Sequence, residues 1–234
     1  LALVASGPDA KNGVEDAGCK APLTKLRAIA GAYPNYIQIV ANKESGIKTL
    51  ADLKGKTISV GAPKSGTELN ARAIFKAAGL TYEDMSKVQY LPFAESVELI
   101  KNRQLDATLQ SSGLGMAAIR DLSSTMPLNY VSIPADVVSK IGNAAYQPAQ
   151  IPANTYDGQP EPVPTVAITN ILVTREDIPD DVAYQMTKLM FENLTRLGNS
   201  HSAAKDIKLQ NAARNLPIPL HPGAERYYKE AGAL

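Results

Sequence analysis

The chain has 234 residues, which is enough for one large or two small domains with a sizeable apolar core. Charged residues make up 20%, hydrophobic residues 44%, and the formal net charge is +1, a balance that argues against a nucleic-acid-binding protein. No run of about 18 apolar residues occurs, so no segment is expected to span a bilayer. The single cysteine, Cys19, cannot form an internal disulfide, which fits a reducing cytosol and equally a disulfide-free secreted protein.

Alternating strand and helix patterns occupy the first half of the chain. Residues 1–7 have the pattern of a strand that runs into a turn, and because the chain begins with Leu rather than Met, we expect further residues upstream. Other strands are predicted at residues 57–60, 87–93, 106–113 and 128–134, and helices at residues 66–78, 94–105 and 114–122. The predicted apolar face of the first helix consists of Leu69, Ala73, Ile74, Ala77 and Ala78. Short connections between these elements predict a parallel α/β sheet.

The second half begins with a proline-rich stretch, residues 146–166. Its five prolines exclude a helix and predict an irregular excursion. A β-rich run follows at residues 164–177, and the longest predicted helix spans residues 179–197. The predicted buried side of that helix consists of Val182, Met186, Leu189 and Leu194. Residues 215–234 are expected to form an extended turn and a short helix.

The sequence contains only incomplete versions of the motifs of common enzymes and metal sites. Gly55-Lys56-Thr57 lacks the earlier glycine of a P-loop, because Leu50 stands there, and it precedes a strand instead of following one. The pattern Ser202-x-x-Lys205 has no partner motifs of a penicillin-binding enzyme. His201 and His221 are the only histidines, and neither lies in a zinc-binding motif. We therefore expect a protein that is not an enzyme and that uses neither metal nor cofactor.

Three loops follow predicted strands, at residues 62–67, 92–95 and 110–113. In a doubly wound sheet, loops at the carboxyl ends of strands share one edge, and ligands bind there. The first loop leads into a helix N-terminus, where free backbone amides attract anions. Ser65, Gly66 and Thr67 are therefore candidates for an anion seat. Ser65 and Glu68 equally match a capping box, in which they would only satisfy the helix start.

The third loop offers three adjacent polar side chains, Gln110, Ser111 and Ser112. These side chains are expected to donate hydrogen bonds to a small polar ligand. The alternative is an ordinary turn at the end of a strand, and the residues alone do not separate the two interpretations.

Several longer stretches resemble one known family. The turn DLKGK, the loop VGAPKSGT and the terminal segment PLHPGAERYY are similar to the TAXI family, the solute-binding subunits of TRAP transporters. The resemblance extends over residues 1–234. Family members normally carry further residues before the equivalent of Leu1, so this chain is expected to lack an N-terminal segment of domain one.

The resemblance implies a two-lobed periplasmic binding protein of type II, with α/β sheets joined by a two-strand hinge near residues 42–46 and 164–168. Domain one would combine residues 1–56 with 163–234, and domain two would span residues 57–162. Such a protein is exported with a signal peptide and works as an extracytoplasmic monomer. It binds a small carboxylate, such as a glutamate-type amino acid or a dicarboxylate, and delivers it to integral membrane subunits.

From domain one, the resemblance adds Tyr33 and Ser6 as ligand-facing residues, while Tyr33 has the alternative role of packing at the hinge. Asn35 stands where the family often has Glu, which is expected to change the charge preference for the ligand. Two other functions share this two-lobed fold. One is the cytosolic effector-sensing domain of a transcriptional regulator. The other is an enzyme such as a pyrimidine-precursor synthase, whose catalytic histidine has no counterpart in a strand-end loop here.

Overall fold

The computed structural model describes residues 2–4, 23–214 and 216–234. It divides into two compact units: unit 1 comprises Leu1–Pro34 and Thr169–Leu234, and unit 2 comprises Asn35–Ile168. Both crossings between the units lie inside long strands, β2 (Leu26–Asn42) and β8 (Val163–Arg175). The division therefore lies inside these strands and not at the expected residues 56 and 163, because the C-terminal half of β2 and the N-terminal half of β8 belong to unit 2.

Unit 2 is built around a sheet in which β2, β5 (Ala107–Ser112), β3 (Thr57–Ser59) and β4 (Lys87–Gln89) are neighbours in that order. Strand β3 is parallel to both β4 and β5, as predicted. Strand β2 is antiparallel to β5, and β6 (Leu128–Val131) is antiparallel to β2 on its other edge. The predicted parallel arrangement was wrong for the pairing of β6, because its partner β2 enters from unit 1 and not through a helical crossover.

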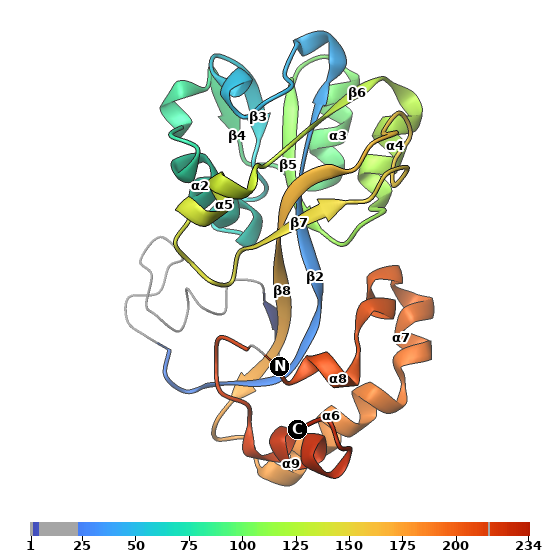
Figure 1. Ribbon diagram of the computed structural model, residues 1–234. Helices are drawn as coiled ribbons and strands as arrows, with labels where there is room; N and C mark the ends of the chain where they lie inside the picture. Colours follow the sequence, from blue (N-terminus) through green and yellow to red (C-terminus); the bar gives the residue numbers. More distant parts are fainter. Residues whose placement is uncertain (1, 5–22, 215) are drawn as a thin grey trace. The chain divides into compact units, whose positions relative to one another are not determined.

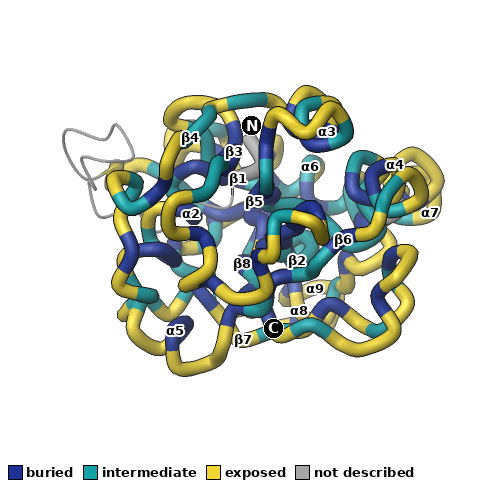
Figure 2. The backbone as a smooth tube through the Cα atoms, turned by 90° about the horizontal axis from the view of Figure 1, so that it is seen from above, coloured by how far each residue is buried: buried dark blue, intermediate teal, exposed yellow. Residues whose placement is uncertain are grey.

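Helices cover both faces of the unit 2 sheet (Figure 1). Helix α2 (Gly66–Ala77) packs with β5 and α5 (Ala135–Lys140), whereas α3 (Phe93–Lys101) packs with β5 and α4 (Ala117–Thr125). Figure 2 shows buried residues along the strands and exposed ones on the outer sides of the helices. Three short 3-10 helices lie in the connections, at Lys43–Ser45, Ala51–Leu53 and Tyr82–Asp84.

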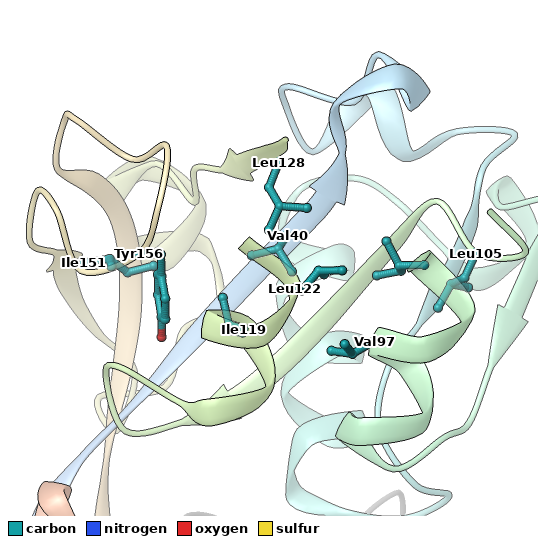
Figure 3. Close-up of a cluster of buried hydrophobic side chains, with 9 residues drawn as sticks. Val40, Val97, Leu105, Ile119, Leu122, Leu128, Ile151 and Tyr156 are labelled. Atoms are coloured by element: carbon teal, nitrogen blue, oxygen red, sulfur yellow. The ribbon is translucent and has the colours of Figure 1, made fainter. Parts of the chain in front are cut away.

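The α3 and α4 side of the sheet carries an apolar cluster (Figure 3). Val40 of β2 packs there with residues of both helices, including Val97 and Ile119. Val97 and Ile100, three residues apart on one face of α3, are both buried. Since side chains of a strand alternate between its two faces, Val40 identifies the even-numbered side chains of β2 as the ones that face this cluster.

The proline-rich stretch contains a strand that the sequence analysis missed, β7 (Gln147–Ile151), which pairs with β8 in antiparallel register. Pro148 lies opposite Val166 in this pair. A proline has no N–H to donate and is tolerated in a strand at an edge, so its presence excluded a helix but not this strand.

In unit 1, β1 (Ala2–Val4) pairs with β8, and helices α6 (Asp180–Glu192), α7 (Leu194–Ser200), α8 (Leu209–Ala212) and α9 (Pro222–Glu230) follow, with a 3-10 helix at Ser202–Asp206. Helices α6 and α9 pack closely. A Cβ added to Gly223 of α9 would lie only 2.0 Å from the carbonyl oxygen of Asp180 in α6. The short C-terminal helix was predicted correctly.

The predicted helix at residues 179–197 is two helices, and its buried face was predicted wrongly. Val182 and Leu189 are 47% and 54% exposed, whereas Ala183 and Thr187 are buried. The close contact between α6 and α9 requires small side chains on the buried face, so the large apolar residues point outward. Periodicity alone favoured the larger residues.

Candidate functional site

The start of helix α2 presents two backbone amides that have no hydrogen-bond acceptor within the described residues. Ser65 is the N-cap residue, and its hydroxyl accepts from the Glu68 amide at 3.2 Å. The first amides of a helix lack intrahelical partners, so this cap leaves those of Gly66 and Thr67 unsatisfied. Together with the positive end of the helix dipole, these two amides are suited to an anion.

The capping box expected from the sequence is only half formed. The Glu68 side chain does not return to the Ser65 amide, which instead donates to the Ala62 carbonyl at 3.1 Å. The Glu68 carboxylate forms an ion pair with Arg72 and accepts a hydrogen bond from the Tyr82 hydroxyl at 3.1 Å. Burial and the neighbouring carboxylate raise the pKa of Tyr82, which therefore remains a donor. The charge of Glu68 is compensated beside the helix start and does not cancel its attraction for an anion.

Two glycines lie at the beginning of α2, one in the preceding loop and one as the first residue of the helix. Gly61 has φ +87°, and a Cβ there would lie 2.8 Å from the Thr67 Cβ, so only glycine fits. A Cβ added to Gly66 would meet nothing within 4 Å. The first residue of the helix therefore borders open space, where a ligand has room to approach the amides.

Ser111 of β5 belongs to a polar network next to α2. Its hydroxyl accepts hydrogen bonds from the Asn35 side-chain amide at 2.8 Å and from the Asn70 side-chain amide at 3.1 Å. The Asn70 oxygen in turn accepts from the Tyr146 hydroxyl at 2.9 Å. Asn70 lies one helical turn after Gly66, which places Ser111 on the same side of the sheet as the helix start.

Gln110 and Ser112 point to the opposite face of β5, toward α3 and α4, because side chains alternate along a strand. The Ser112 hydroxyl accepts from Gln38 at 2.9 Å, and Gln38 lies directly opposite Gln110 in the sheet. Gln110 is fully buried, and both polar atoms of its side chain lack a partner within the described part of the chain, as does the Thr108 hydroxyl. The structure thus brings Ser65, Gly66, Thr67 and Ser111 together and separates Gln110 and Ser112 from them.

Tyr156 joins Gln38 to the start of α4 on this second face. Its hydroxyl donates to the Gln38 side-chain oxygen and accepts from the amides of Gly115 and Met116 at 3.1 and 3.3 Å. Burial raises the pKa of Tyr156, so the hydroxyl remains protonated in this network. A tyrosine distant in the sequence thus caps a helix whose own residues supply no side-chain cap.

The structure describes only one of the two ligand-facing residues predicted in domain one. In unit 1, the Tyr33 ring stacks on His201 with centroids 5.8 Å apart, and its carbonyl accepts from the Asn170 side chain at 3.3 Å. Ser6 lies outside the described residues. Both remain predictions drawn from the resemblance.

A family model describes nearly the whole chain, matching residues 1–232. The chain belongs to the NMT1-like family. This assignment is coarser than the TAXI family proposed from the sequence motifs, and it leaves the type of transporter open.

Solved structures define the fold of this NMT1-like chain. A periplasmic transporter, 13% identical, has a TM-score of 0.55, with 99% of this chain covering 72% of that one. A protein of Bordetella bronchiseptica RB50, 16% identical, has a TM-score of 0.50, with 97% of this chain covering 62% of that one. The periplasmic aliphatic sulphonate binding protein SsuA of Escherichia coli is 14% identical over 97% of this chain and 70% of that one, with a TM-score of 0.49. The chain has the mixed α/β fold of type II periplasmic binding proteins, as predicted.

Two kinds of feature are absent from the described part of the NMT1-like chain. None of the helices in residues 23–214 and 216–234 is both long and apolar enough to cross a membrane. Within the same ranges, no three side chains of His, Cys, Asp or Glu gather closely enough to hold a metal ion.

Sequence reasoning missed two members of the Ser111 network, Asn70 and Tyr146. Asn70 is 3% exposed on the buried side of α2, between positions that the apolar pattern had marked. The sequence could have indicated Asn70, because it lies four residues after Gly66 and therefore on the same face of the helix. Tyr146 lies in a stretch predicted to be irregular, and no local pattern connects it to α2.

Proposed function

We propose that this protein is an extracytoplasmic solute-binding protein that captures a small carboxylate and delivers it to the membrane subunits of a TRAP-type secondary transporter. The fold and the NMT1-like family support a solute-binding protein, and the motif resemblance supports the TRAP assignment. The observation that carries the proposal is the pair of amides at Gly66 and Thr67, which have no acceptor among the described residues and lie one helical turn from Asn70 of the Ser111 network. These groups would hold a carboxylate through the helix dipole and hydrogen bonds.

The charges around this helix start favour a carboxylate over a cation. The nearest buried acid, Glu68, is neutralised by Arg72. Lys64, which is exposed with φ 59°, adds a positive charge in the loop before the helix. An anion therefore meets the positive end of a dipole without a competing uncompensated charge. A glutamate-type amino acid or a dicarboxylate fits this chemistry.

Isothermal titration calorimetry with a panel of amino acids and mono- and dicarboxylates tests the binding function. Ser111→Ala is expected to weaken binding of the preferred carboxylate by about tenfold or more, because hydrogen bonds to charged groups are worth roughly 1.5–3 kcal/mol. Ser112→Ala is the matched control: it removes the same hydroxyl from the next residue, on the other face of β5, and is expected to leave affinity within about twofold.

Gly66→Ala tests the seat without removing a backbone donor. The added methyl meets open space in the protein, so folding is expected to be unchanged, but the methyl would occupy the approach to the amides and weaken carboxylate binding. Equal affinities for Gly66→Ala, Ser111→Ala and the unmodified protein would show that the carboxylate binds elsewhere. Failure of every carboxylate to bind would contradict the proposed ligand class.

Transport in proteoliposomes tests the proposed partner. Uptake of the bound carboxylate by the reconstituted TRAP membrane subunits should require this protein and an ion gradient. Uptake that requires ATP hydrolysis and ignores the gradient would reject the TRAP assignment but leave the binding function intact.

A further inference from the structure

The Ser111 hydroxyl has only one hydrogen-bonding capacity left. A hydroxyl group has one proton to donate and two lone pairs that accept. Two amide N–H groups, from Asn35 at 2.8 Å and Asn70 at 3.1 Å, already donate to this oxygen. Both acceptor positions are therefore occupied, and any further bond of Ser111 must use its proton.

The amide of Asn70 has the orientation that makes it a donor to Ser111. Its side-chain oxygen accepts from the Tyr146 hydroxyl at 2.9 Å, so its nitrogen is directed toward Ser111. Asn35, Asn70 and Tyr146 are 8%, 3% and 8% exposed, which limits competition from water. Reversal of the Asn70 amide would require both hydroxyls to turn as well, so that Ser111 would donate its proton to Asn70 and the Tyr146 oxygen would accept from it.

Ser112 shows that this arrangement is particular to Ser111. The Ser112 hydroxyl accepts from Gln38 at 2.9 Å and lies 3.2 Å from the Gly113 carbonyl, which can take its proton. Its donor and acceptor capacities thus find partners within the protein. Adjacent serines of one strand differ in what they can offer a ligand.

We propose that Asn35, Asn70 and Tyr146 are positioning residues that make Ser111 a donor only, so that this seat selects hydrogen-bond acceptors. The inference rests on the proposed function, because it assumes that the ligand meets Ser111 beside the start of α2. The amides of Gly66 and Thr67 are also donors, so every group assigned to the seat donates. The seat takes the oxygens of a carboxylate and excludes an ammonium group, which has only protons to offer.

A double-mutant cycle between Tyr146 and Ser111 tests the proposal, with the carboxylate that the calorimetric panel identifies as probe. Tyr146→Phe removes the hydroxyl that orients Asn70, so the amide can turn and present its oxygen to Ser111. The serine proton would then be diverted from the ligand, and affinity should fall by roughly three- to tenfold. In the Ser111→Ala background the same change should have almost no effect, because the proton is already absent.

Asn70→Asp gives a second cycle with a stronger perturbation. The introduced carboxylate accepts from Ser111 and also repels an anionic ligand. Repulsion alone would weaken binding equally with and without Ser111, whereas diversion of the proton adds a loss of about tenfold only when Ser111 is present. Urea unfolding of each variant confirms that the compared proteins are folded.

The outcomes separate this inference from the proposed function. Absence of carboxylate binding, or binding that Ser111→Ala leaves unchanged, overturns the seat itself. If Ser111→Ala weakens binding but Tyr146→Phe and Asn70→Asp act equally in both backgrounds, the seat stands and the positioning role is wrong. Tight binding of an alkylamine with no carboxylate, lost in Ser111→Ala, would also overturn donor-only selection.

Discussion

On one face of β5, Ser111 joins Asn35, Asn70 and Tyr146 in a connected network of hydrogen bonds. On the other face, Gln110 and Thr108 are fully buried and lack partners within the described residues. The two faces of one strand thus carry similar side chains in different states. One face uses its polar groups to orient a donor beside a helix start, whereas the other encloses polar groups under α3 and α4.

The second face also contains a well-connected network, which lies next to the unpaired groups. Gln38 uses both ends of its amide, with Ser112 and Gly113 on one side and Tyr156 on the other. Its cross-strand neighbour Gln110 has the same side chain and the same burial, but its amide has no partner in the part of the chain that the structure describes. Identical chemistry therefore gives opposite energetic contributions, depending on whether tertiary partners reach it.

The largest expected effect comes from the same substitution on the two faces. Tyr156→Phe leaves the Gln38 oxygen and the amides of Gly115 and Met116 without a partner, and we expect it to lower the free energy of unfolding by roughly 2–4 kcal/mol. Tyr146→Phe removes the bond to Asn70, whose amide keeps Ser111 as a partner, and should cost about 1 kcal/mol. Urea unfolding at neutral pH measures both. Equal decreases in the free energy of unfolding would show that the two tyrosine hydroxyls contribute equally to stability.

A smaller effect, with opposite signs, is expected for the paired glutamines. Gln110→Met keeps the shape of the side chain and removes two unpaired buried atoms, so the free energy of unfolding should rise by about 1–3 kcal/mol. Gln38→Met removes an amide that is hydrogen-bonded at both ends and leaves its partners unpaired, so the free energy of unfolding should fall by a similar amount. Destabilisation by Gln110→Met would show that its amide has partners, such as internal water, that these contacts do not reveal.

The same contrast separates the features that the sequence predicts from those that it does not. Strand and helix order in residues 57–131 followed from periodicity, because each element there is a short βα unit with an apolar face. The loop before α2 was identified from its small residues and its place after a strand. Gln110, Ser111 and Ser112 were grouped because they are adjacent, yet the pleat of β5 sends Ser111 to one face and the other two to the opposite face.

The remaining features depend on contacts between residues far apart in the chain. Asn35 and Tyr146 are separated from Ser111 by 76 and 35 positions, and no local pattern links them. The buried face of α6 was mispredicted for a related reason: the distant Gly223 packs against the α6 backbone, and the small Ala183 is buried whereas the larger Val182 is exposed. Local periodicity predicts elements, whereas partners across the sheet determine which polar side chains are satisfied.

The smallest expected effect is a change of stability at alkaline pH, which arises from a tyrosine on the α3 and α4 side of the sheet. The Tyr130 ring stacks on Tyr156 at 5.9 Å, and burial raises the pKa of Tyr130 to about 12, from its usual value of 10.0. Its ionisation is thus harder in the folded than in the unfolded protein. The resulting contribution to stability is complete below about pH 10 and is lost as the pH rises toward about 12. Because the hydroxyl is only half-buried, solvent screening keeps this contribution small.

Tyr130→Phe isolates this contribution. The substitution also removes the hydrogen bond to the Asp157 carbonyl at 2.8 Å, so it should destabilise the protein at neutral pH. That deficit should narrow between about pH 10 and 12, since the phenylalanine variant has no group to ionise there. Urea unfolding at several alkaline pH values, with tyrosinate absorbance followed in the folded protein, measures the change. A deficit that stays constant with pH would show that Tyr130 ionises equally easily in both states, and that this side of the sheet is more hydrated than its burial indicates.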